Sequence, residues 1–88
     1  MLFRRSVPQA VYELVTREGC HLCDEMALLL DEVLPSHGLS YSLRDVDADP
    51  ALRERFTDVV PVLLRDGIPV AKLRLDLQGL DRIVRRRR

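Results

Sequence analysis

The sequence predicts a small α/β domain, with a four-stranded mixed sheet and three helices in the order β-α-β-α-β-β-α. Two observations predict this class. Short apolar runs rich in β-branched residues alternate with longer segments whose apolar residues recur at helical spacing. Two cysteines at C-x-x-C spacing, Cys20 and Cys23, stand at the first change between these patterns. The length of 88 residues is enough for one such domain with an adequate hydrophobic core.

The domain is expected to span residues 10–84. Residues 1–9 are predicted to form a loose leader. Residues 85–88 are all arginine and are predicted to form a basic C-terminal tail, whose positive charge suits the C-terminus of a helix. An alternative for this tail is contact with an acidic partner or RNA.

The first half of the chain supplies the elements that flank the cysteines. Residues 11–16 predict a buried strand, and residues 17–19 the turn after it. A helix is predicted from about residue 22 to residue 34, ended by Pro35 and Gly38. Residues 39–46 predict a second strand. Because a helix joins the two strands, we expect them to be parallel.

The second half is expected to begin with a short helix. Asp49 is predicted to cap it and Pro50 to occupy its first position, and the helix should end near Phe56. Residues 59–64 then predict a third strand, with Pro61 near its start.

A hairpin and a last helix complete the predicted order. Asp66-Gly67 favours a tight turn into a strand over residues 68–75. Alternate residues of this strand should face solvent, namely Val70, Lys72 and Arg74. Asp76 is predicted to cap the last helix. That helix should bury its apolar side chains, which are Leu77, Leu80, Ile83 and Val84.

The placement of the cysteines predicts redox chemistry. A thiolate at a helix N-terminus meets unpaired N–H groups and the positive end of the helix dipole, which lowers the thiol pKa from about 8.5 to roughly 3.5–7.5. We expect Cys20 to be the nucleophile that forms a mixed disulfide, and Cys23 to resolve it. One alternative is a pair of inert, buried cysteines.

Metal binding is a further alternative. The cysteines are half of a zinc site, for which His21 and His37 are additional candidates, but the sequence has no second C-x-x-C. The alternating Asp45, Asp47 and Asp49 resemble a hard-cation site, yet Asp49 is already explained as a helix cap. We therefore predict no metal.

Three local features of the chain resemble the glutaredoxin-like branch of the thioredoxin superfamily. The segment from Arg17 to Cys23 looks like the glutaredoxin active-site loop, with a basic residue three positions before the first cysteine. Val60-Pro61 looks like the cis-proline that faces the dithiol in that superfamily. Residues 45–50 are similar to a strand-to-helix turn of small glutaredoxin-like proteins. The resemblance covers nearly all of the chain from residue 10 and implies a thioredoxin-like (glutaredoxin-type) fold.

The resemblance also implies residues that bind substrate. A cis bond at Pro61 would turn the backbone of Val60 toward the dithiol, where it would pair with a substrate strand; the alternative is a trans proline at a strand start. A charged His21 would favour the Cys20 thiolate, and Arg17 would stabilise that thiolate or hold a substrate carboxylate. Plain surface roles are the alternatives for His21 and Arg17.

The implied function is that of a small thiol–disulfide oxidoreductase. Two departures count against glutathione. His21-Leu22 replaces the usual Pro-Tyr between the cysteines, and the Gly-Gly turn before the last helix is missing. We therefore expect no cofactor and only weak use of glutathione. The alternative function is a non-catalytic binding module that docks a partner at the cis-proline cleft.

Composition limits the partners. Fourteen basic residues balance fourteen acidic ones, which gives no reason to expect nucleic acid. No run of apolar residues is long enough for a membrane span. The expected partner is a disulfide-containing protein or a small thiol, met by a monomer in the cytoplasm, where thiols stay reduced.

Overall fold

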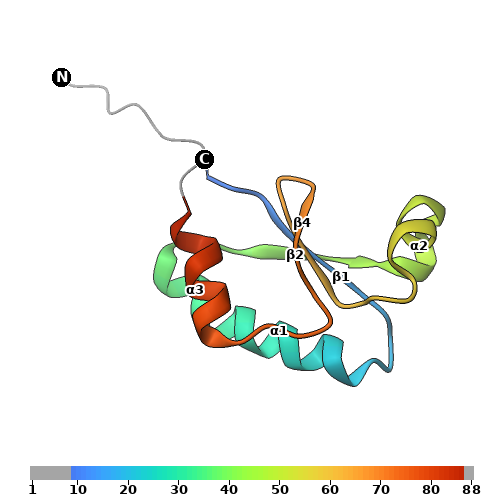
Figure 1. Cartoon of the computed structure of the whole chain (residues 1–88), viewed down its shortest axis with the longest axis horizontal. Coiled ribbons are helices and arrows are strands. Elements are labelled where there is room, and N and C mark those ends of the chain that lie inside the picture. Colours follow the sequence, from blue (N-terminus) through green and yellow to red (C-terminus); the bar gives the residue numbers. More distant parts are fainter. Residues whose placement is uncertain (1–8, 87–88) are drawn as a thin grey trace.

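The computed structural model describes residues 9–86, which form a four-stranded mixed sheet with helices on both faces (Figure 1). The strands are β1 (Tyr12–Thr16), β2 (Tyr41–Asp45), β3 (Val62–Arg65) and β4 (Ile68–Lys72). The α-helices are α1 (His21–Val33), α2 (Pro50–Phe56) and α3 (Leu77–Arg85). Two 3-10 turns, Leu34–His37 and Val46–Ala48, follow α1 and β2. The predicted α/β class and the order of its elements are confirmed.

The sheet order β2-β1-β3-β4 places β1 in the interior of the sheet. It pairs in parallel with β2 and antiparallel with β3. The last β1–β3 pair joins Val15 to Val62. Pro61, directly before β3, therefore lies at the end of the sheet where β1 runs into the cysteine loop.

Two apolar clusters hold the helices to opposite faces of the sheet. On one face, Leu14 of β1 packs with α1 and α3; the buried members of this cluster are Tyr12, Leu14, Met26, Leu30, Leu34, Leu63 and Leu80. On the other face, Val15 packs with α2; the buried members here are Val15, Val46, Leu52, Phe56, Val62 and Leu64. Because β1 contributes to both clusters, the strand that leads into the cysteines is fixed from both sides.

The hairpin between β3 and β4 follows the predicted turn. Asp66 and Gly67 have φ angles of 53° and 81°, as a type I′ turn requires. The predicted alternation after it is wrong, because the register shifts between Leu63 and Leu64 and both Val70 and Ala71 pack against the core. The strand also ends early, at Lys72.

Two other boundary predictions and one prediction of burial are wrong. The third strand begins at Val62, because Val59 still bonds to the end of α2 and Pro61 has no N–H to give to a ladder. Val11 lies outside β1 and is exposed. Leu77 begins α3 but is also exposed, since the inward face of that helix starts at Leu80.

The predictions for the two ends of the chain fall mostly on residues that the structure does not describe. Residues 1–8 of the predicted leader and residues 87–88 of the predicted tail lie outside the described residues. Arg85 is the last residue of α3 and pairs with Asp81, one helical turn before it, at 2.8 Å. Within residues 9–86, no helix has both the length and the apolar character needed to cross a membrane.

Candidate redox site

The two cysteines lie where the β1–α1 loop becomes α1. Gly19 has a φ of 75°, so the loop reverses at a residue that tolerates a left-handed backbone. The Cys20 N–H donates to the carbonyl of Arg17 at 3.3 Å, which closes the turn. Cys20 is then the N-cap of α1, and its Sγ accepts a hydrogen bond of 3.1 Å from the N–H of Cys23. A sulfur thus occupies the position where helices usually carry an oxygen cap.

Cys20 and Cys23 are joined by a disulfide. The Cα atoms are 5.2 Å apart, within the usual range of about 4.4–6.8 Å. Cys23 is only 1% exposed, whereas Cys20 is half-buried. Cys20 is therefore the more accessible of the two sulfur atoms.

Arg17 joins the cysteine loop to the opposite side of the sheet. Its Nε and Nη2 donate to the two carboxylate oxygens of Asp47 at 2.8 and 2.9 Å. Its Nη1 and Nη2 also donate to the backbone carbonyl and the hydroxyl of Thr57, at 3.0 and 2.6 Å. The guanidinium predicted to bind substrate is thus bound to the turn after β2 and to the end of α2.

This contact shifts the titration of both charged partners. The hydrogen bond from Arg17 holds the pKa of Asp47 below its ordinary value, against the opposing effect of desolvation. The same hydrogen bond raises the pKa of Arg17. Both shifts favour the charged forms of Arg17 and Asp47, which are the forms that make the ion pair.

His21, between the cysteines, points to solvent. Its Nε2 lies 2.7 Å from Oε2 of Glu25, one helical turn along α1, and its side chain is 86% exposed. The structure thus gives this histidine a carboxylate partner on the outer surface of the helix, beside the cysteine loop.

Val60 and Pro61 lie at the same end of the sheet as the cysteine loop. The peptide bond between them is cis, and Pro61 is buried. The carbonyl of Pro61 accepts a hydrogen bond of 2.8 Å from the N–H of Leu73. The half-buried Val60 forms no backbone hydrogen bond with another residue of the described chain.

Two of the aspartates that were weighed as ligands of a hard cation have local partners. Asp45 accepts from the N–H of Asp47, and Asp49 caps α2 by accepting from Ala51 and Leu52. Asp49 also pairs with Arg44 at 3.0 Å. Over residues 9–86, no three His, Cys, Asp or Glu side chains gather closely enough to hold a metal ion.

Comparison with known proteins agrees with this arrangement. A family model described as Glutaredoxin-like domain (DUF836) matches residues 12–85. The chain belongs to this family. Curated relatives of this glutaredoxin-like domain include an uncharacterized protein of Mycobacterium bovis and one of Mycobacterium tuberculosis. Both are 40% identical over 60 residues, which cover 62% of this chain and 62% of each relative. The match thus spans less than two thirds of their length.

A solved structure shares the fold. The solution NMR structure of protein Ne2328 from Nitrosomonas europaea superposes with a TM-score of 0.77 at 24% identity. The superposition covers 93% of this chain and 99% of the chain of that structure. At this identity the likeness establishes the thioredoxin-like fold alone.

Sequence reasoning missed two features of this glutaredoxin-like site. Asp47 and Thr57 hold the cysteine loop through Arg17, over separations of 30 and 40 residues. A bidentate pair between distant residues leaves no periodic signal in a sequence. Leu73 was expected in a strand, but it has a φ of 66° and binds Pro61. Nothing in a run of alternating residues marks that change.

Proposed function

We propose that this glutaredoxin-like domain is a small thiol–disulfide oxidoreductase that works through Cys20 and Cys23. One observation carries the proposal, namely the unequal exposure of two bonded cysteines at the N-terminus of a helix. A half-buried capping sulfur suits attack, and a buried second sulfur suits resolution. The helix N-terminus favours the thiolate of Cys20 once the pair is reduced.

The proposed exchange begins with the reduced protein. The Cys20 thiolate attacks one sulfur of a substrate disulfide, and the other substrate sulfur leaves as a thiolate that takes up a proton. Cys23 then loses its proton and attacks Cys20, which releases the second substrate sulfur as a thiol. The substrate gains two electrons and two protons, and the protein returns to the disulfide form. Run backward, the same steps oxidise a substrate dithiol.

The backbone next to Pro61 supports docking of an extended substrate. Val60 has unpaired peptide groups at the same end of the sheet as the cysteines, which suits strand addition by a disulfide-bearing segment. Glutathione is proposed to be a poor partner, because the loop before α3 has no Gly-Gly pair. A cytoplasmic location belongs to the proposal, since a reducing compartment lets such a pair cycle.

Redox titration tests this proposal. The protein is first equilibrated separately with glutathione and with thioredoxin as electron donors, which shows whether each donor reduces the Cys20–Cys23 disulfide. Turnover of a chromogenic aromatic disulfide is then followed with each donor. We expect turnover that depends on Cys20, with thioredoxin as the better donor. The Cys20→Ser variant is the control and should be inactive. If neither donor reduces the Cys20–Cys23 disulfide, the domain is a binding module rather than an oxidoreductase.

A further inference from the structure

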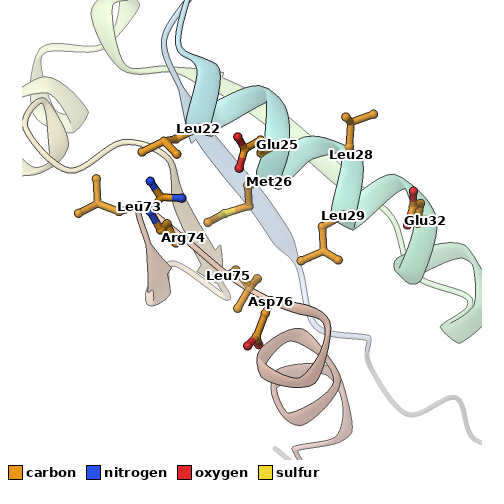
Figure 2. Close-up of a pocket in the computed structure, with 10 residues that line it drawn as sticks. All are labelled: Leu22, Glu25, Met26, Leu28, Leu29, Glu32, Leu73, Arg74, Leu75 and Asp76. Atoms are coloured by element: carbon orange, nitrogen blue, oxygen red, sulfur yellow. The ribbon is translucent and has the colours of Figure 1, made fainter.

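A cavity of about 750 Å³ opens between α1 and the loop that joins β4 to α3 (Figure 2). Its wall begins at Leu22, which lies between the two cysteines in the sequence, and continues along α1. The facing wall is the loop that starts at Leu73, the residue bound to Pro61. The cavity is therefore an extension of the redox site, and its apolar lining consists of Leu22, Met26, Leu28, Leu29, Leu73 and Leu75.

Four charged side chains line this cavity, and two of them are already engaged. Glu25 pairs with His21, and Asp76 caps α3 by accepting from the N–H of Gly79 at 2.7 Å. Glu32 and Arg74 also line it, and neither side chain forms a hydrogen bond or ion pair within residues 9–86. One anion and one cation are thus left for a ligand.

The two unpaired charges lie at opposite ends of the cavity. Figure 2 shows Arg74 beside Leu22 and Leu73, while Glu32 lies near the far end of α1. Ten residues separate Leu22 from Glu32, which is about 15 Å along a helix. An extended peptide covers that distance in roughly four to five residues.

We propose that this cavity binds a peptide segment of a disulfide-bearing protein substrate, with an acidic side chain next to the reacting cysteine and a basic side chain four to five residues away. Arg74 receives the acidic side chain, Glu32 the basic one, and the leucines the apolar residues between them. The inference rests on the proposed function, because the peptide is held while its cysteine exchanges with Cys20. It adds a substrate class to that function.

A thiol-exchange competition tests the charge order. The Cys23→Ser variant holds one thiol on Cys20 as a mixed disulfide, and a second thiol displaces the first without net oxidation. Two peptide thiols of equal composition compete, one with the acid near the cysteine and the base four to five residues away, the other with the charges exchanged. Two versions of this peptide pair are made, one with the distant charge on the N-terminal side of the cysteine and one with it on the C-terminal side. Mass spectrometry then gives the ratio of the two peptides bound to Cys20.

The matching charge order should be preferred. An exposed ion pair changes an equilibrium constant by about 1.4- to 5-fold, so two pairs give roughly 2- to 25-fold. An acidic neighbour also changes the thiol of the peptide itself. For that reason the decisive comparison is with Arg74→Glu combined with Glu32→Lys, which should invert the preference for the same two peptides.

A matched control carries the same exchange of charge elsewhere. Glu54 and Arg82 are exposed and do not line the cavity. The double substitution Glu54→Lys with Arg82→Glu should leave the ratio of the two bound peptides unchanged. Equal binding of both peptides in every background would overturn the inference, as would glutathione displacing both. If Cys20 forms no mixed disulfide with any thiol, it is the proposed function that fails.

Discussion

The backbone N–H of Leu73 donates a hydrogen bond of 2.8 Å to the carbonyl oxygen of Pro61. This bond holds the end of β4 beside the segment that precedes β3. Leu73 adopts a φ of 66° to make it, although its side chain carries a Cβ that resists this conformation. Its side chain is 42% exposed. The packing of the Leu73 side chain therefore offsets little of the strain in its backbone.

Leu73 should consequently reverse the usual ranking of alanine and glycine. In the middle of a helix or strand, a protein with glycine is less stable than the same protein with alanine by roughly 0.5–1 kcal/mol. Here Leu73→Gly removes the left-handed strain and Leu73→Ala does not, so we expect the glycine variant to be more stable than the alanine variant by about 1 kcal/mol. Urea unfolding of the two variants measures the difference. Greater stability of the alanine variant would contradict this account of residue 73.

The two cysteines should react differently. Because Cys23 is buried and Cys20 is half-buried, the reduced protein should be alkylated first at Cys20. The Cys23→Ser variant should accumulate mixed disulfides, whereas Cys20→Ser should form none. The pKa of the Cys20 thiol should lie below the value of about 8.5 for a free cysteine. Peptide mapping after brief iodoacetamide treatment checks the order, and faster labelling of Cys23 would reverse the roles.

The Arg17–Asp47 pair predicts a loss of stability in acid. The folded-state pKa of Asp47 is lowered by Arg17, so its contribution to stability is present above the unfolded pKa of about 3.9 and is lost as the pH falls through the folded value. The Asp47→Asn variant lacks this contribution. The gap in unfolding free energy between wild type and variant should therefore be widest near neutral pH and should narrow in acid.

Urea midpoints at several pH values measure that gap. The effect should be modest, since the Asp47 side chain is 50% exposed. The exposed Glu54 provides the control, because it forms no hydrogen bond or ion pair among residues 9–86 and Glu54→Gln should show no such narrowing. A gap between wild type and Asp47→Asn that widens in acid would rule out the pair as its source.

Tyr41 should titrate late. Burial, and then the hydrogen bond of 2.8 Å that its hydroxyl donates to Asp31, raise its pKa to about 12. A raised pKa stabilises the fold below the unfolded value of about 10 and loses that effect as the pH rises through 12. Asp31→Asn should lower the pKa of Tyr41 but keep it above the unfolded value, since burial remains. Tyrosinate absorbance follows the titration, and the Tyr41→Phe variant shows which part of the signal belongs to Tyr41. An unchanged Tyr41 pKa in the Asp31→Asn variant would contradict the role of the Asp31 hydrogen bond in raising it.

The parts of the fold that could be predicted are those whose cause is local in sequence. Asp49 and Asp76 were expected as helix caps, and both accept hydrogen bonds from the first turns of their helices. The Asp66-Gly67 turn likewise has the φ angles that its residues favour. Each cap and the turn depend only on residues within about four positions along the chain, and the sequence shows these residues directly.

The parts that could not be predicted depend on residues far apart. Arg17 was expected near the redox chemistry, but no local pattern pairs it with Asp47 or Thr57, which lie 30 and 40 residues away. The register shift at Leu63/Leu64 appears only when two strands are paired, and it puts Val70 and Ala71 on the core together. The final course of β4 is thus decided by packing rather than by alternation.

The position of Arg17 has a consequence for protein engineering. Its guanidinium ties the cysteine loop to Asp47 and Thr57, which belong to segments on the α2 side of the sheet. Moving residues 17–23 into another scaffold would transplant the sulfur atoms but leave their support behind. A portable version of this loop needs a carboxylate and a hydroxyl supplied by the host, at the places that residues 47 and 57 occupy here.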